Sequence, residues 1–130
     1  MIVIGELINA TRKKVREAVI AHDEEVIKSR AKLQDEAGAD YIDVNVGTGK
    51  GDTAQEIEHM KWAVGVVQEV TDKPISVDSP DNDAIRAGLE VCREGQKHFV
   101  NSVTAETDRL VPTLELVREY ETNVVALAMG

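Results

Sequence analysis

The sequence predicts an α/β fold of the (βα)8-barrel type, of which these 130 residues form about the first half, with parallel strands in the order βαβαβαβαβ. Two observations predict this fold. Short apolar runs rich in β-branched residues alternate with longer segments of helical period, an order that requires right-handed crossovers and a parallel sheet. Each strand-and-helix unit takes roughly thirty residues, which is the length of one unit in an eight-stranded barrel of about 250 residues. The alternation alone leaves an open doubly wound sheet as the other possible closure.

The predicted strands are short and have the character of buried parallel strands. They are rich in Val and Ile and are bounded by Gly, Pro, Asp or Asn, which is typical of strands covered on both faces. We expect strands at residues 2–4, 41–46, 75–77, 98–100 and 123–127.

The first helical stretch, over residues 11–37, is expected to consist of two pieces. The helical period breaks near His22, and Asp23 is placed to cap the piece that follows. Gly38 is placed to end that second piece, because glycine readily adopts the left-handed conformation found after helix C-termini.

Cap patterns predict where the later helices begin. Thr53 and Glu56 have the spacing of a capping box. Ser79 is the expected N-cap of the next helix, with Pro80 at the first helical position, where its missing N–H costs nothing. The last helix is expected over residues 112–120.

Composition restricts the function classes. The chain has 24 acidic and 15 basic residues and a formal net charge of −9, which argues against nucleic acid or an anionic membrane as a partner. No signal peptide or membrane-spanning segment is apparent. The single cysteine, Cys92, rules out an intramolecular disulfide and indicates a reducing compartment, so we expect a cytoplasmic protein. Cys92 itself is interpreted as a small core residue.

Polar residues recur where each of the first four predicted strands ends. The carboxyl ends of parallel strands meet at one edge of the sheet, which is where such folds bind ligands. Asp and Asn also begin turns and cap helices, so any single position has a capping explanation as well. The candidate residues are Glu6 and Asn9, Asp43 and Asn45, Asp78 and Ser79, and Asn101 and Ser102.

The types of these side chains restrict the ligand. A carboxylate such as Asp78 accepts paired hydrogen bonds from an edge with two N–H donors, whereas the amide of Asn101 donates and accepts. This combination suits a nitrogen heterocycle with an amino-imino edge better than a phosphate. The competing hypothesis is a hard cation bound by Glu6, Asp43 and Asp78.

Other motifs do not fit known sites. The loop at 47–52 resembles a phosphate loop, but Lys50 is not followed by Ser or Thr, and the dinucleotide fingerprint also fails. We interpret the loop as a rim segment whose glycines allow unusual backbone angles. His22, His59 and His98 are too dispersed for a zinc site, so the first two are expected at helix surfaces or boundaries and the third at the start of a strand.

Four segments together resemble the pterin-binding barrels: GELIN at 5–9, IDVNVG at 42–47, SVDS at 76–79 and VNS at 100–102. Within this TIM-barrel family, the sequence is most similar to the methyltetrahydrofolate:corrinoid methyltransferases. It is also similar to the folate module of cobalamin-dependent methionine synthase. The resemblance runs along the whole chain, so residues 1–130 are expected to form the N-terminal half of a pterin-binding barrel domain.

The resemblance implies a reaction and a set of roles. The family moves a methyl group between N5 of methyltetrahydrofolate and the cobalt of a cobalamin carried by a separate corrinoid protein, and the barrel itself binds no metal. Asp78 and Asn101 match the residues that hold the pterin ring. The asparagine that activates N5 is expected beyond the end of this chain. The other matching residues, which line or support the pocket, are Glu6, Asn9, Asp43, Asn45, Ser79 and Ser102.

Two further readings stay open. The chain also resembles dihydropteroate synthase, although the loop after Asn9 lacks the Asp- and Gly-rich pattern of that enzyme. A non-catalytic pterin-binding or assembly module is the alternative from another class. Half a barrel exposes two strand edges and an unfinished interior, so we expect self-association, as a homodimer, or a remaining half elsewhere in the protein.

Overall fold

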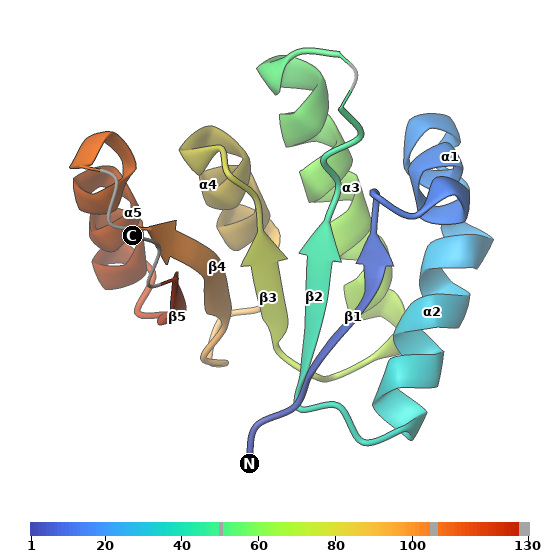
Figure 1. The fold of residues 1–130 in the computed structure, drawn as a ribbon. Coiled ribbons are helices and arrows are strands. Elements are labelled where there is room, and N and C mark those ends of the chain that lie inside the picture. Colours follow the sequence, from blue (N-terminus) through green and yellow to red (C-terminus); the bar gives the residue numbers. More distant parts are fainter. Residues whose placement is uncertain (50, 105–106, 128–130) are drawn as a thin grey trace.

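The computed structural model describes residues 1–49, 51–104 and 107–127. Five parallel strands alternate with helices along the chain (Figure 1). The elements are β1 (Ile4–Asn9), α1 (Lys13–Ala21), α2 (Glu24–Glu36), β2 (Tyr41–Asn45), α3 (Thr53–Val70), β3 (Ile75–Asp78), α4 (Asn82–Val91), β4 (Phe99–Thr104), α5 (Thr107–Glu119) and β5 (Asn123–Leu127).

The strands lie in the sheet in their sequence order, β1-β2-β3-β4-β5, and every neighbouring pair is parallel. The helices all lie on one side of the sheet (Figure 1). A doubly wound sheet reverses its strand order and carries helices on both faces. The observed order therefore decides between the two closures and confirms the first half of a (βα)8 barrel.

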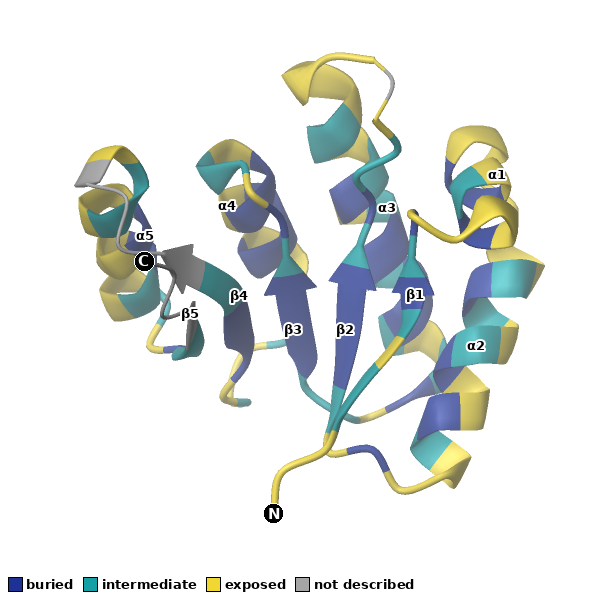
Figure 2. Ribbon diagram, viewed as in Figure 1, coloured by how far each residue is buried: buried dark blue, intermediate teal, exposed yellow. Residues whose placement is uncertain are grey.

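One face of the sheet supplies the apolar core. Ile42, Val44, Ile75, Val77 and Val100 are completely buried between the strands and the helices, and Figure 2 shows the buried sides of the helices turned toward the sheet. Since successive side chains of a strand point to opposite faces, the residues between these point away from the helices.

The opposite face of the sheet is concave. The rings of Tyr41 on β2 and Phe99 on β4 meet edge to face, with centroids 4.5 Å apart, although β3 lies between their strands. Strands two apart are about 9.6 Å apart in a flat sheet, so a ring contact across β3 is consistent with a sheet that curls toward this face. Curling toward the face without helices is the geometry of a barrel interior.

Strand β1 differs from its prediction. The strand expected at residues 2–4 instead runs from Ile4 to Asn9. A bulge between Gly5 and Ile8 interrupts the alternation of apolar residues, so the sequence pattern did not reveal the full strand. The buried side chain of Gln34 on α2 accepts a hydrogen bond from the Leu7 backbone N–H at 3.0 Å. A Cβ on Gly5 would lie 2.3 Å from Gln34 Oε1. The glycine therefore leaves room for the Gln34 side chain, which hydrogen-bonds the backbone of the bulge at Leu7.

The predicted break between α1 and α2 is confirmed. His22 ends α1 in the left-handed conformation with φ 52°, and Asp23 caps α2 by accepting a hydrogen bond from the Glu25 N–H at 3.2 Å. Gly38 follows the end of α2 with φ 91°, as its position predicted. No helix in the described ranges has the length and apolarity needed to span a membrane.

Two predicted helix caps are wrong. The capping box of α3 is formed by Asp52 and Gln55, one residue before the predicted pair. Helix α4 is capped by Asp81, whose carboxylate accepts from the Asp83 N–H at 2.8 Å, and not by Ser79. In both places an aspartate one or two residues from the predicted cap accepts the hydrogen bond, and a carboxylate is a stronger acceptor than a hydroxyl.

Helix α5 begins at Thr107, earlier than the predicted start at Pro112, which lies inside the helix. Proline is favoured at a first helical position, and that preference misplaced the boundary. The buried hydroxyl of Thr113 on α5 donates to the Asn82 side chain at 2.8 Å and joins α5 to α4.

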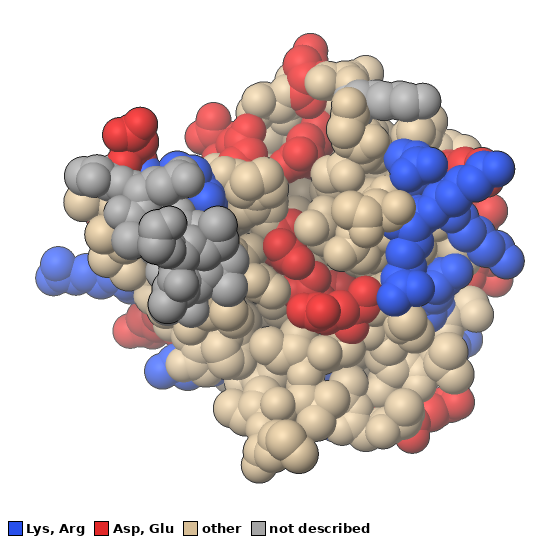
Figure 3. Space-filling model, viewed as in Figure 1, with Lys and Arg blue, Asp and Glu red and all other residues tan. Residues whose placement is uncertain are grey.

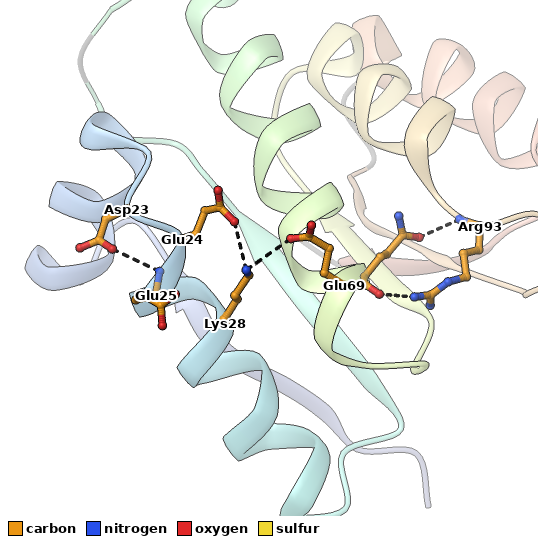
Figure 4. A network of polar contacts seen from close by, with 7 residues as sticks. Asp23, Glu24, Glu25, Lys28, Glu69 and Arg93 are labelled. Carbon is orange, nitrogen blue, oxygen red and sulfur yellow. Dashed lines mark hydrogen bonds and ion pairs between the residues drawn. The ribbon is translucent and has the colours of Figure 1, made fainter.

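Polar contacts join the helices on the outer surface (Figure 4). Lys28 on α2 contacts Glu24 at 3.1 Å and reaches Glu69 on α3 at 3.7 Å. The backbone N–H of Arg93 donates to the side chain of Gln68 at 2.7 Å, and its guanidinium donates to the Gln68 carbonyl oxygen. Exposed ion pairs of this kind contribute little to stability, so the apolar core holds the fold together.

Two helical glycines give a matched test of this packing. A Cβ on Gly88 would lie 2.7 Å from Val77 Cγ1 and 3.0 Å from Met60 Cγ, whereas a Cβ on Gly65 would meet nothing within 4 Å. We expect Gly88→Ala to lower the free energy of unfolding by ~1–3 kcal/mol through overpacking. Gly65→Ala should raise it by ~0.5–1 kcal/mol through helix propensity. Urea unfolding measures both, and equal effects of the two substitutions would contradict the packing described.

Candidate functional site

The parallel register brings polar residues of neighbouring strands side by side on the concave face. Figure 3 shows acidic side chains gathered over the middle of this face and near the strand exits, whereas Lys and Arg lie at its two sides, most of them at the right around α1. None of the strands β1 to β4 contains a Lys or Arg. The facing pairs are Asn9 with Asn45, Asp43 with Ser76, and Asp78 with Asn101.

Asp43 lies at the centre of these contacts. Its side chain is completely buried. Its Oδ1 accepts hydrogen bonds from the Ser76 hydroxyl at 2.7 Å and from the Asn101 amide Nδ2 at 3.1 Å. We call Asp43, Ser76, Asp78 and Asn101 the strand-exit site, because β2, β3 and β4 each contribute to it.

The environment of Asp43 favours its neutral form. Burial, a hydrogen bond with Asp78 and the negative charge of Asp78 raise the pKa of Asp43 to about 9, against smaller opposing effects of its bonds from Ser76 and Asn101. A hydrogen bond between two carboxyl groups needs a proton on one of them. Among the described residues no donor reaches Asp43 Oδ2, which is the atom that such a proton would occupy.

Asn9 and Asn45 are engaged in turns. The side-chain oxygen of Asn9 accepts from the backbone N–H of Thr11 at 2.9 Å and from its hydroxyl at 2.8 Å. The side-chain oxygen of Asn45 accepts from the Gly47 N–H at 3.0 Å. For these two residues the structure supports the turn-forming interpretation, although their amide N–H groups stay available to face a ligand.

Ser79 is tied to α3 rather than to a helix start. It is 3% exposed, and its hydroxyl donates to Glu56 Oε2 at 2.6 Å and accepts from the Asp81 N–H at 3.0 Å. Because Asp52 and Asp81 form the two caps, Ser79 and Glu56 are free to bind each other. Glu56 thus joins the rim of the strand exits, a role that the sequence did not predict.

The remaining two predicted residues lie at the margins. Glu6 is exposed, and its position in the β1 bulge is opposite Asp43 on β2. Ser102 is half-buried, and its backbone oxygen accepts from Arg109 on α5 at 3.5 Å. Neither side chain contacts the strand-exit site through a hydrogen bond between described residues.

The alternative of a cation bound by Glu6, Asp43 and Asp78 finds no support in this arrangement. Within the described part of the chain, no group of three or more His, Cys, Asp or Glu residues is arranged to hold a metal ion. A cation at Asp43 Oδ1 would have to displace the two hydrogen-bond donors that occupy it.

The histidines on the helices meet in space. His22 Nε2 lies 3.0 Å from His59 Nδ1, and the His22 ring stacks on Trp62 with centroids 4.3 Å apart. This confirms their place at helix surfaces, but 37 residues separate them in sequence and no local pattern predicted the contact. Of the 47–52 loop, Gly49 and Gly51 have φ of 75° and 84°, as expected, while Lys50 lies outside the described residues.

His98 and Cys92 serve the packing at the other end of the sheet. His98 precedes β4 instead of starting it, and its Nδ1 accepts from the Ile75 N–H at 3.0 Å. Burial lowers the pKa of His98. Cys92 packs against the core, and burial raises the pKa of its thiol to about 12, which makes it a poor nucleophile.

A cavity of about 850 Å³ lies away from the strand exits. It is formed by the end of α4, the loop before β4 and the loop before β5, and its lining includes Arg93, His98, Tyr120 and Thr122. In parallel α/β folds ligands bind at the carboxyl ends of the strands. We therefore assign the candidate site from the convergence of Asp43, Asp78 and Asn101 and not from cavity size.

These features define a class of protein: a parallel βα barrel fold with an acidic, hydrogen-bonding site where its strands end. The sequence model of the pterin binding enzyme family matches residues 5–130. The chain belongs to this family.

Curated relatives carry more specific names. The chain is 36% identical over 129 residues to the methylcorrinoid:tetrahydrofolate methyltransferase of Eubacterium limosum, which covers 99% of this chain and 46% of the relative. It is 37% identical over 136 residues to the methionine synthase of Mycobacterium leprae (strain TN) and 34% identical over 136 residues to that of Mycobacterium tuberculosis (strain ATCC 25618 / H37Rv). Each match covers 99% of this chain and 11% of the synthase. The chain thus spans about half the length of the first relative and a small part of the others.

The raised pKa of Asp43 predicts a pH dependence of stability. Between 3.8, its ordinary pKa, and about 9, the native state holds a proton that the unfolded state has released, so the free energy of unfolding falls as the pH rises. Asp43→Asn removes this loss. We expect the variant to gain stability relative to the unmodified protein from pH 5 to pH 8, by at most about 1.4 kcal/mol per pH unit. Urea unfolding at both pH values checks this, and a difference that stays constant with pH would contradict it.

Proposed function

We propose that the protein is a methyltransferase that moves a methyl group between N5 of methyltetrahydrofolate and the cobalt of a corrinoid protein. The observation that carries this proposal is the convergence of Asp43, Asp78 and Asn101 on the concave face at the strand exits. Membership of the pterin binding enzyme family supports a pterin as the ligand. The printed names of the relatives support methyl transfer and a corrinoid partner.

In this proposal Asp78 and Asn101 hold the pterin ring. They face each other across β3 and β4 and are both half-buried, so ligand atoms can reach them. The Asp78 carboxylate would accept from two neighbouring N–H groups, a charge-assisted contact suited to an amino-imino edge. Glu6, Asn9, Asn45, Ser79 and Ser102 would border or support the pocket.

The reaction requires that the pterin be held in position and that the charge developing at N5 be stabilised. The methyl carbon leaves N5 without its bonding electrons, which stay on N5 and are stabilised there by a proton or a strong hydrogen bond. The corrinoid supplies the attacking electron pair from Co(I) when its carrier protein docks. The residues of this chain would fix the pterin so that N5 faces the open side of the pocket. No side chain of the strand-exit site forms a covalent bond in this scheme.

The competing enzyme reading is a dihydropteroate synthase-like protein, which the family match alone allows. The relatives named as a methylcorrinoid:tetrahydrofolate methyltransferase and as methionine synthases favour methyl transfer. A non-catalytic pterin-binding or assembly module would bind folate and show no methyl transfer to a corrinoid protein. Methyl transfer assayed with a corrinoid protein therefore separates the proposed enzyme from both.

The proposal extends to the organisation of the protein. Residues 1–130 would form the N-terminal half of a pterin-binding barrel domain, with β1 and β5 as the edges that need a neighbour. Either a further part of the barrel or a second copy in a homodimer would cover the edges and the concave face. Light scattering of the purified protein distinguishes a monomer from a dimer.

Asp78 gives the most direct test of the pterin site. We expect Asp78→Ala to weaken methyltetrahydrofolate binding by about 2–3 kcal/mol, or roughly 30- to 150-fold, through loss of a charge-assisted hydrogen bond. Calorimetric titration measures this effect. Two controls should keep the affinity: Asp72→Ala, which removes the same charge before β3 starts, and His59→Ala on α3. Unchanged affinity in a folded Asp78→Ala variant would contradict the assignment.

A further inference from the structure

The hydrogen bonds around Asp43 are unequal on its two oxygens. Oδ1 accepts from Ser76 and Asn101, whereas Oδ2 is buried and has no donor among the described residues. A buried carboxylate oxygen without a donor is costly. After burial, the largest influence on the pKa of Asp43 comes from Asp78, which also carries a carboxyl group. Asp78 satisfies Oδ2 only if a proton lies between them.

We propose that Asp43 is a positioning residue that acts as a carboxylic acid: its Oδ2–H donates to Asp78 while its Oδ1 holds the amide nitrogen of Asn101. The inference rests on the proposed function, because it concerns how the two pterin-holding residues are oriented. Asp43 itself is completely buried, so it acts on the ligand through Asp78 and Asn101.

This arrangement fixes what the site presents to a ligand. Since Asn101 Nδ2 is turned toward Asp43, its oxygen is on the other side of the planar amide and is available as an acceptor. Asp78 accepts the Asp43 proton on one oxygen and offers the other as an acceptor to the ligand. The site therefore presents acceptors from both strands and selects a heterocycle edge that carries N–H donors over one that carries only acceptors.

The charges around Asp43 agree with this assignment. On β3, Ser76 is opposite Asp43 and the ionisable Asp78 follows two residues later; on β1, Glu6 lies in the bulge beside β2, and Asn101 on β4 is neutral. On the side of α5, Arg109 donates to the backbone of Ser102 and not to a carboxylate. Among the described residues no cation is paired to Asp43, so the proton on Asp43 limits its repulsion with the neighbouring Asp78.

Substitution of Asp43 by asparagine tests whether the residue acts as a neutral acid or as a charged carboxylate. Asp43→Asn places an N–H₂ where the acid carries its proton and keeps an oxygen for Ser76 and Asn101. We expect it to bind methyltetrahydrofolate within about threefold of the unmodified protein at pH 7, whereas Asp43→Ala should bind at least about tenfold more weakly. The unmodified protein should lose affinity relative to Asp43→Asn as the pH rises through about 9, because only it loses the proton.

The outcomes identify which claim fails. Titrations are made at pH 7 and pH 9.5, with folding of each variant checked by circular dichroism. If the unmodified protein binds and a folded Asp43→Asn variant is as weak as Asp43→Ala, Asp43 is needed as a charge and the inference is wrong. If affinity of the unmodified protein and of Asp43→Asn changes identically with pH, it is also wrong. If the folded, unmodified protein shows no binding at all, the proposed function fails and the inference fails with it.

Discussion

The site depends on one constraint, the burial of the Asp43 carboxyl group among three strands. A carboxyl group cut off from water must obtain its hydrogen bonds from the protein. Here Ser76 on β3 and Asn101 on β4 supply donors to Oδ1, and in the proposed arrangement the proton on Oδ2 is donated to Asp78. Satisfying this one group orients the polar residues that end two further strands. The candidate site is thus organised from within the sheet, and its accessible residues are held by a residue that no solvent reaches.

The parallel register makes this arrangement possible. It places Asp43 beside Ser76 and Asp78 beside Asn101 on the concave face, while the apolar side chains of the same strands pack against the helices. Tyr41 and Phe99 close the lower part of the face by direct contact across β3. Apolar contacts thus hold these strands together on both sides of the polar side chains that the register pairs. Stability and the site depend on the same strands but on opposite faces of them.

The sequence predicted the order of elements and the residues at the strand exits, because buried strands and exit residues are both local signals. Contacts between distant segments were not predictable in the same way. Ser76 was not singled out because a serine inside an apolar strand gives no sign of the carboxyl group opposite it, and that signal becomes visible only when the register is known. The spacing of Thr53 and Glu56 predicts a capping box, but Asp52 and Gln55 form it, and Glu56 binds Ser79 instead. The bulge in β1 obscured the period on which strand prediction relies.

In the proposed arrangement Asp43 carries a proton at neutral pH and donates it to Asp78. The most direct measurement is a ¹³C NMR titration of the aspartate carboxyl carbons, with Asp43 assigned by comparison with Asp43→Asn. We predict that the Asp43 signal has the chemical shift of a carboxylic acid at pH 7 and titrates near pH 9. A signal that is already that of a carboxylate at pH 7 would contradict the account, because the buried group would then be a charge and the orientation of Asn101 and Asp78 would need another explanation.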